Sequence, residues 1–291
     1  MRIGIACSAG SYKGVFVHGV LTGLSELESQ VDIYAASSST AAAAAYAAAG
    51  DLPFLKGPEH WKRMYTGYVA SNYDVSKAVL EAIPEYTERL LGTLFSPDAK
   101  RFAVAVSAVM TKEAEELTQG PGARRLGQQL VLATRKRDRS WADGNLQTRL
   151  FQSGFPTAAF KLTARNMNEV FYATTRMLHA WKTPAWIDGQ PYLDASYTCM
   201  CPALELAEMG CTEIIAISSE VGPLYRDFFQ SFEIPSGYLD ARIHLIKPQS
   251  ELAEIGVDYM KVSDEGLHIA YDLGLQAGKE FAKSHTITKA L

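Results

Sequence analysis

The chain has 291 residues, with 28 Lys and Arg against 32 Asp and Glu, which gives a formal net charge of −4. With 47% hydrophobic and 21% charged residues, the composition is that of an ordinary globular protein and excludes a disordered chain, a collagen-like chain and a disulfide scaffold. There is no basic excess to suggest nucleic-acid binding, and no apolar run approaches the roughly 18 residues that span a bilayer.

Short β-type runs alternate with helical stretches along the chain. The first run, residues 2–7, has one positive charge and a very short apolar stretch, so it predicts a strand and not a signal peptide. The alanine-rich stretch 41–49 predicts a helix that ends at Gly50. Further strands are predicted over 31–36, 101–109, 159–164, 169–173, 213–218 and 241–247, and further helices over 14–29, 203–209 and 263–284.

This alternation is typical of an α/β fold. It predicts three layers, α/β/α, with a mostly parallel central sheet that has helices on both faces. Because no repeat or low-complexity linker interrupts the chain, we expect a single domain over residues 1–291. Residues 51–100 fit the alternation least well and are expected to be helical, either as a lid or wall of a substrate site or as ordinary peripheral helices.

The four cysteines are Cys7, Cys199, Cys201 and Cys211. Cys199 and Cys201 are too close in sequence for an ordinary loop-closing disulfide, and no histidine stands at metal-ligand spacing from them. We interpret all four as free thiols in a reducing compartment, with the cytoplasm as the expected location.

A loop of mostly small residues, 8–14, lies directly after the first predicted strand and before a helix. Backbone N–H groups in such a turn can point at an anion, and the positive end of the helix adds to the attraction. A tight strand-to-helix turn without a ligand explains the same residues. Glycines at positions 4, 10 and 14 do not match the dinucleotide fingerprint, which argues against a nucleotide-binding protein.

Three serines, Ser37, Ser38 and Ser39, stand between the second predicted strand and the alanine helix. A nucleophile elbow places a serine at such a corner, with small residues two positions to either side. Local sterics do not choose between the three serines. Capping of the helix is a second role that these residues can serve.

Asp194 follows the apolar residues Tyr192 and Leu193 and precedes the small residues Ala195 and Ser196. An Asp at the end of a strand can act as a general base at the edge of a sheet. The alternative is a turn Asp with a purely structural role.

Together these segments resemble the patatin-like phospholipase family over most of the chain. That family opens with a strand, a glycine-rich oxyanion loop and a Gly-Val-Leu helix, to which residues 5–14 and 19–21 are similar, with Lys13 as the basic residue of the loop. Residues 31–50 match the family's elbow without a gap, which makes Ser38 the nucleophile position. The family's Asp-Gly-Gly or Asp-Gly-Ala motif, with its later proline, corresponds to Asp194 and Pro202 here.

The resemblance implies a Ser–Asp dyad without a histidine, in which Ser38 is the nucleophile and Asp194 the base. The backbone N–H groups of Ala9, Gly10 and Ser11 would form the oxyanion hole. The implied protein is a serine acyl hydrolase that cleaves fatty acyl esters of phospholipids or lysolipids through an acyl-serine, with no cofactor and no metal.

The expected partner is therefore a lipid or another acyl ester, and no nucleic acid is expected. Peripheral contact with a membrane is open, because the basic stretch 135–139 can touch lipid phosphates; a solvated loop is the other interpretation. Trp61 and Trp181 can line an acyl pocket or pack the core.

The chain departs from the family at several glycine positions, and each replacement adds a Cβ where the backbone approaches itself or the substrate. Because Ser38 and Asp194 are both present, we expect an active or weakly active enzyme. Two alternatives stay open: a non-catalytic lipid-binding or regulatory protein on the same fold, and an acyltransferase that uses the same acyl-serine. The replaced positions are Ala9, Ser11, Ala36, Thr40, Ala195 and Ser196.

Overall fold

The central β-sheet of the computed structural model has nine strands within residues 1–284, the part of the chain that the structure describes. Residues 285–291, the end of the expected single domain, lie outside the described residues. The strand order is β5-β6-β3-β2-β1-β7-β9-β8, and β4 also pairs with β3. The strands are β1 (Ile3–Cys7), β2 (Val31–Ser37), β3 (Arg101–Val109), β4 (Leu146–Ser153), β5 (Trp186–Ile187), β6 (Gln190–Leu193), β7 (Glu213–Ile217), β8 (Gly237–Tyr238) and β9 (Ala241–Ile246).

The centre of the sheet is parallel and its edges are antiparallel. Neighbouring strands from β3 through β2, β1 and β7 to β9 run parallel. Strands β4 and β6 are antiparallel to β3, β5 to β6, and β8 to β9. The predicted α/β fold class is confirmed, with a mixed sheet in which the parallel part is confined to the centre.

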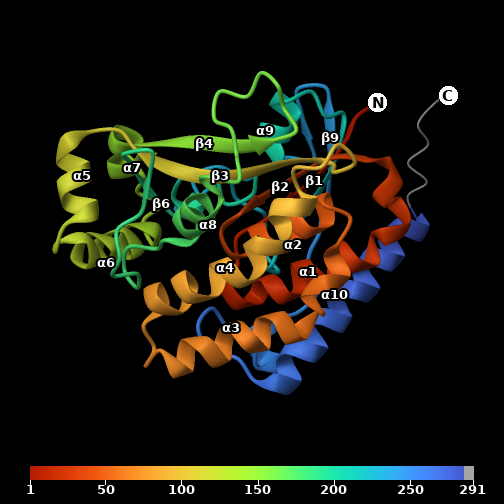
Figure 1. The fold of residues 1–291 in the computed structure, drawn as a ribbon, viewed down its shortest axis with the longest axis horizontal. Helices are drawn as coiled ribbons and strands as arrows, with labels where there is room; N and C mark the ends of the chain where they lie inside the picture. The colour runs from red at the N-terminus through yellow and green to blue at the C-terminus, as the bar shows by residue number, and fades with distance from the viewer. Residues whose placement is uncertain (285–291) are drawn as a thin grey trace.

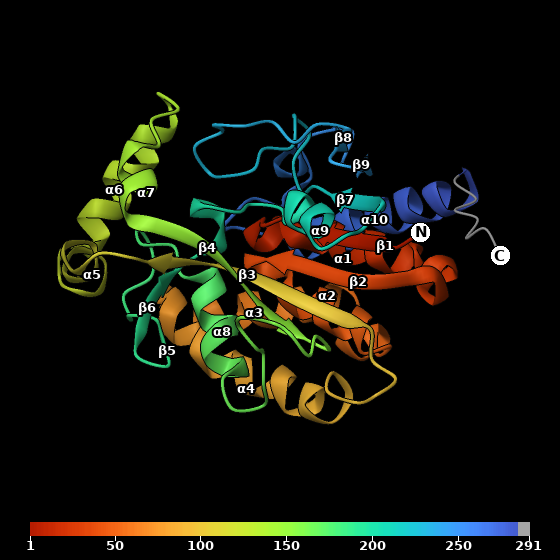
Figure 2. The same cartoon turned by 90° about the horizontal axis from the view of Figure 1, so that it is seen from above.

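Helices cover both faces of the sheet unequally (Figure 1, Figure 2). On one face, apolar side chains of α1, α2, α3, α4, α8 and α10 join Ile5 and Cys7 of β1 in the largest core. On the other face, Leu204 and Leu206 of α9 pack with Ala6 of β1. Side chains alternate between the faces of a strand, so consecutive residues of β1 enter different cores. The helices are α1 (Gly14–Gly23), α2 (Ala41–Ala48), α3 (Pro58–Ala70), α4 (Val75–Thr93), α5 (Lys112–Gln119), α6 (Ala123–Thr134), α7 (Ser140–Asn145), α8 (Met167–Thr175), α9 (Ala203–Glu208) and α10 (Asp264–Ser284).

Most of the predicted elements are confirmed. The strands expected over 2–7, 31–36, 101–109, 213–218 and 241–247 are β1, β2, β3, β7 and β9, and the helices expected over 41–49, 203–209 and 263–284 are α2, α9 and α10. The helix expected over 14–29 ends at Gly23, and a 3₁₀ helix follows over Ser25–Gln30. Residues 51–100 contain α3 and α4, and the four cysteines are free and buried.

Two predicted strands are wrong. Residues 169–173 lie inside α8, because a five-residue apolar run has no period that separates a strand from a buried helix. Residues 159–164 form only an isolated bridge, between Lys161 and Gln152 of β4. Gln152 alone exchanges backbone hydrogen bonds with this segment, through Phe160 and Leu162, so the pairing does not extend into a strand.

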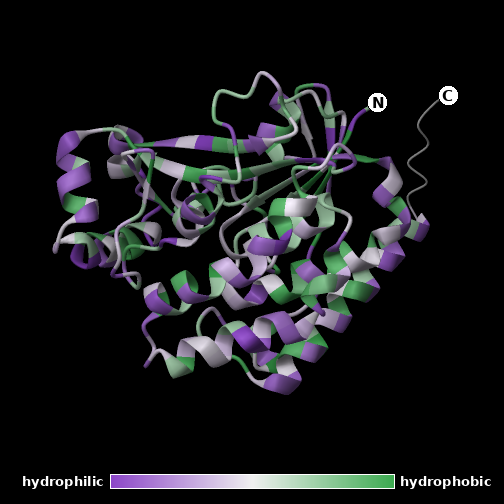
Figure 3. Cartoon of the chain, in the orientation of Figure 1, coloured by the Kyte–Doolittle hydropathy of each residue, from purple (hydrophilic) through white to green (hydrophobic). Residues whose placement is uncertain are grey.

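Glycines bring α1 and α10 into backbone contact. A Cβ on Gly19 would lie 2.1 Å from the carbonyl oxygen of Tyr271, and one on Gly274 would lie 2.1 Å from that of Phe16. The alternation of hydrophobic and hydrophilic residues along α10 is visible in Figure 3, yet its contact with α1 depends on residues without side chains. No helix within residues 1–284 is both long and apolar enough to cross a membrane.

Replacing Gly274 with Ala is expected to destabilise the fold by about 1–3 kcal/mol, because the added methyl group forces two packed backbones apart. Gly92→Ala in α4 is the matched control, since no heavy atom lies within 4 Å of the added Cβ and alanine favours a helix by up to about 1 kcal/mol. Urea unfolding compares the two variants with the wild type. Equal unfolding midpoints for Gly274→Ala and the wild type would contradict the close packing.

Candidate active site

Ser38 lies at a sharp corner between a strand and a helix. Strand β2 ends at Ser37, a 3₁₀ turn covers Ser38–Thr40, and α2 begins at Ala41. Ser38 has a φ of +58°, a left-handed conformation that costs a residue with a side chain about 1–3 kcal/mol. Its N–H donates to Oγ1 of Thr174 at 2.9 Å, and that hydroxyl donates to the Ala105 carbonyl at 2.7 Å. Helix α8 and strand β3 thereby hold the strained corner in place.

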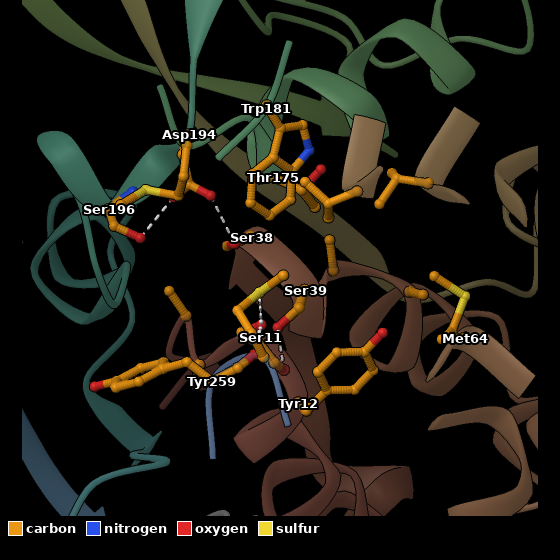
Figure 4. A pocket seen from close by; sticks show the side chains of 18 of the residues that line it. Ser11, Tyr12, Ser38, Ser39, Met64, Thr175, Trp181, Asp194, Ser196 and Tyr259 are labelled. Carbon is orange, nitrogen blue, oxygen red and sulfur yellow. Dashed lines mark hydrogen bonds between the residues drawn. The ribbon is translucent and has the colours of Figure 1, made fainter. Parts of the chain in front are cut away.

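The three serines at this corner have different partners. The Ser37 hydroxyl donates to the carbonyl of Cys199 at 2.8 Å, and the Ser39 hydroxyl donates to the carbonyl of Ser11 at 2.8 Å. The Ser38 hydroxyl donates to Oδ2 of Asp194 at 2.8 Å (Figure 4). Of the three, Ser38 alone is paired with a group that can take its proton.

At this corner, Ala36 and Thr40 replace glycines of the family that the sequence resembles, and neither needs the left-handed backbone that favours glycine. Thr40 has a right-handed φ of −81°, and its hydroxyl lies 3.0 Å from the carbonyl oxygens of both Ser8 and Ser37. Ala36 belongs to β2 and pairs with Cys7 of β1. Thr40 therefore connects the corner to the loop after β1 without straining the turn.

Asp194 follows β6 and has hydrogen-bond donors at both carboxylate oxygens. Its Oδ1 accepts from the N–H of Ser196 at 2.7 Å and from the Ser196 hydroxyl at 2.5 Å, and its Oδ2 accepts from Ser38. Burial raises the pKa of Asp194 from 3.8 to about 6, although the hydrogen bonds from Ser196 and Ser38 lower it. This carboxyl is mostly ionised at neutral pH and basic enough to take a proton from a hydroxyl in a transition state.

The loop after β1 lines a cavity that Ser38 and Asp194 also border. Ser11 has a φ of +48°, and its hydroxyl donates to the carbonyl of Tyr259. The N–H of Ala9 donates to the carbonyl of Met200 at 2.8 Å, so this expected oxyanion donor is already occupied. The N–H groups of Gly10 and Ser11 have no backbone acceptor among the turn and loop contacts of residues 1–284.

Ser38 and Asp194 border a cavity of about 470 Å³, a volume typical of small-molecule sites. Helices α3 and α4 of the 51–100 region form part of its wall, and Trp61 and Trp181 both line it, in agreement with one of the sequence interpretations. The part of the lining that comes from α3, α4, α8 and residues 177–181 is largely apolar. It consists of His60, Trp61, Met64, Val75, Val79, Tyr86, Phe171, Met177 and Trp181.

The histidines that border the cavity are poor candidates for proton transfer. Burial lowers the pKa of His60 to about 4, and burial also lowers the pKa of His179. Within residues 1–284, the hydrogen bonds of Ser38 and Asp194 do not include a histidine. In this arrangement, Asp194 is the group placed to accept the proton of the Ser38 hydroxyl.

A cluster of ionic contacts around the buried Lys13, beside the loop, was not predicted. Lys13 Nζ lies 3.0 Å from Oε2 of Glu220, 3.8 Å from Oε2 of Glu251 and 4.4 Å from the centre of the Tyr259 ring. The Tyr259 hydroxyl donates to Oε1 of Glu220 at 2.7 Å. These contacts hold the 259–260 segment over the loop. The basic residue was visible in the sequence, but nothing there marked its distant partners.

Comparison with known proteins finds little similarity in sequence. No family model matches the chain, and no curated protein matches it. Among solved structures, the chain is similar to the crystal structure of VipD from Legionella pneumophila. The likeness covers 98% of this chain and 67% of that chain, with 11% sequence identity and a TM-score of 0.49. Such a likeness is too distant to assign a function.

Proposed function

We propose that the protein is a serine acyl hydrolase that cleaves fatty acyl esters of phospholipids or lysolipids. The observation that carries the proposal is the 2.8 Å hydrogen bond from Ser38 Oγ to Asp194 Oδ2 beside a largely apolar cavity. A hydroxyl at a strained corner, paired with a buried base, has the arrangement of an activated nucleophile. The apolar lining suits an acyl chain, and the motif resemblance to patatin-like phospholipases supports the same substrate class.

In the proposed reaction, Ser38 Oγ attacks the ester carbonyl carbon while Asp194 takes the hydroxyl proton. The N–H groups of Gly10 and Ser11 donate to the oxyanion of the tetrahedral intermediate. The bond to the alcohol then breaks, and the alcohol leaves with the proton from Asp194. Water attacks the acyl-Ser38 ester, Asp194 accepts its proton, and return of that proton to Ser38 Oγ releases the fatty acid.

Labelling with a fluorophosphonate probe tests whether Ser38 is an activated nucleophile. We expect the wild type to be labelled, Ser38→Ala to be unlabelled, and Ser37→Ala and Ser39→Ala to keep the label, because their hydroxyls contact backbone carbonyls only. An unlabelled but folded wild type would remove the hydrolase proposal and favour a non-catalytic lipid-binding protein. Acyl transfer to an added alcohol that outpaces hydrolysis would favour an acyltransferase.

Ser196→Ala is expected to move the acidic limb of the rate profile to higher pH. The wild-type rate falls as the pH drops through about 6, because Asp194 must be ionised to act as a base. Loss of the Ser196 hydroxyl removes a donor that lowers the pKa of Asp194. On the acidic limb, the rate falls about tenfold for each pH unit by which that pKa rises. Ser196→Thr keeps a hydroxyl and is expected to restore the profile. Matching profiles for Ser196→Ala and the wild type would show that the Ser196 hydroxyl does not set the pKa of Asp194.

A further inference from the structure

The outer face of α6 is basic and free of acidic residues. From Leu117 to Arg137 the sequence contains no Asp or Glu. The buried face of the helix consists of small and apolar residues, so the bases all lie on the solvent side. The exposed bases in and directly after α6 are Arg124, Arg125, Arg135, Lys136 and Arg137.

Within the described residues, none of these five bases forms an ion pair with a carboxylate. The ion pairs in this part of the described chain belong to Arg139, which contacts Asp143 and Asp227. Asp138, the acidic residue after the run, accepts hydrogen bonds from Ser140. These hydrogen bonds and the charge of Lys136 lower the pKa of Asp138, so one carboxylate faces five bases. A positive face on a chain with a net charge of −4 complements a polyanionic surface specifically at this end of the molecule.

The same face carries an apolar residue and adjoins the cavity. Leu132 is 56% exposed in the middle of the basic residues, and Val131 and Thr134 beside it line the cavity of Ser38. Gly127, on the buried side, packs so closely that a Cβ there would lie 2.3 Å from the backbone nitrogen of His179, another lining residue. Figure 2 shows α6 projecting at one end of the molecule, beyond the sheet.

We propose that the outer face of α6 docks onto an anionic lipid bilayer. Lys and Arg near such a surface are attracted to its negative potential, and an exposed leucine beside them adds apolar surface that the interface can bury. Leu132 enters the interface while the five bases contact headgroups, which brings the cavity to the membrane. The idea that the membrane supplies the acyl ester rests on the proposed function. Binding of α6 to the membrane does not depend on catalysis.

Vesicle sedimentation tests the docking, with Ser38→Ala as the parent protein so that no lipid is hydrolysed. We expect the parent to bind phosphatidylcholine vesicles that contain phosphatidylserine and to bind phosphatidylcholine alone weakly. The triple change Arg135→Gln, Lys136→Gln, Arg137→Gln is expected to weaken binding to the anionic vesicles at least about tenfold. The change Lys56→Gln, Lys279→Gln, Lys283→Gln removes the same charge elsewhere on the exposed surface and is expected to leave binding intact.

A salt series and a further variant separate the contribution of the basic residues from that of Leu132. Added salt is expected to weaken binding of the parent, because it screens exposed charges. Leu132→Gln is expected to weaken binding at low and at high salt. Thermal melting confirms that each variant is folded before it is scored.

The proposal is overturned if the two triple variants bind equally or if the parent does not sediment with anionic vesicles. Retention of the parent on heparin, without vesicle binding, would assign the basic face to another polyanion and would also overturn it. Fluorophosphonate labelling of the protein with Ser38 intact is scored separately. Intact labelling with failed docking therefore removes only this inference, and docking without labelling removes only the hydrolase.

Discussion

Asp194→Asn is expected to lower acyl transfer by about 10²- to 10⁴-fold, the usual contribution of a general base, and yet to stabilise the fold at neutral pH. The amide cannot take the Ser38 proton. Its oxygen can still accept the hydrogen bonds from Ser196 that Oδ1 of Asp194 accepts now, so the 3₁₀ turn over Ala195–Tyr197 is retained. Asp194→Asn is therefore expected to lose activity while it stays folded.

The gain in stability follows from the buried charge. Burial raises the pKa of Asp194 from 3.8 to about 6, so the folded state binds this proton more tightly than the unfolded state does. The stabilisation from protonation is complete below about pH 3.8 and is lost as the pH rises through about 6. At pH 8 the ionised side chain therefore destabilises the wild type by at most about 3 kcal/mol, a penalty that the neutral amide avoids.

Urea unfolding of the wild type and of Asp194→Asn, at pH 8 and at pH 4, measures this penalty. The difference in unfolding free energy is expected to be large at pH 8 and to shrink toward pH 4. Ser38→Ala also removes activity but keeps the buried carboxyl and removes a donor that lowers its pKa. It is therefore expected to lose stability between pH 4 and pH 8, as the wild type does. Equal unfolding free energies for wild type and Asp194→Asn at both pH values would contradict a charged, desolvated Asp194.

The parallel centre of the sheet could be predicted because each strand is a short buried run next to a helix. Strands β1, β2 and β7 are almost wholly buried, and their sequences are correspondingly apolar. Strand β4 was missed since most of its residues are half-buried or exposed and include Arg149 and Gln152. Its place at the edge depends on pairing with β3, which local sequence does not encode.

The contact between α1 and α10 was also outside the reach of sequence periodicity. The helix predicted over 263–284 is α10, but its apolar residues Ile269 and Leu273 are 39% and 45% exposed. The contact with α1 uses Gly274 and Gly278 instead. Because glycine gives no hydrophobic signal, hydrophobic periodicity could not identify the face of α10 that packs most closely against α1.

Ser38 and Asp194 were predicted because a strand-to-helix corner and the end of a strand are local features. Sterics left Ser37, Ser38 and Ser39 equivalent, and the motif resemblance favoured Ser38. The hydrogen bond to Asp194 distinguishes it in the structure. The occupied Ala9 amide could not be foreseen, because its acceptor, the Met200 carbonyl, comes from a distant segment whose position is set by the fold.

Gly10→Ala is expected to reduce kcat by about 10²- to 10³-fold, the effect of losing one oxyanion donor. Gly10 has an extended φ of −175°, so the penalty comes from space and not from backbone conformation. The added Cβ would lie 2.4 Å from Oγ and 2.7 Å from Cβ of Ser219. Ser219 is itself fixed, since its hydroxyl donates to the Ala9 carbonyl at 2.9 Å and its N–H donates to Ser8 Oγ at 3.1 Å. The loop that carries the Gly10 and Ser11 amides must therefore move.

Adding Ser219→Gly to Gly10→Ala distinguishes a displaced loop from general damage. The second change vacates the space that the new methyl group needs, so the double variant is expected to recover part of the lost kcat, although it loses the hydrogen bond to Ala9. Ser219→Gly alone measures that loss. Because oxyanion donors act mainly in the transition state, the changes should appear in kcat on a soluble ester at a nearly constant KM. A double variant no faster than Gly10→Ala would show that the clash with Ser219 is not the cause, and the position of these two amides would then lose its proposed part in the reaction.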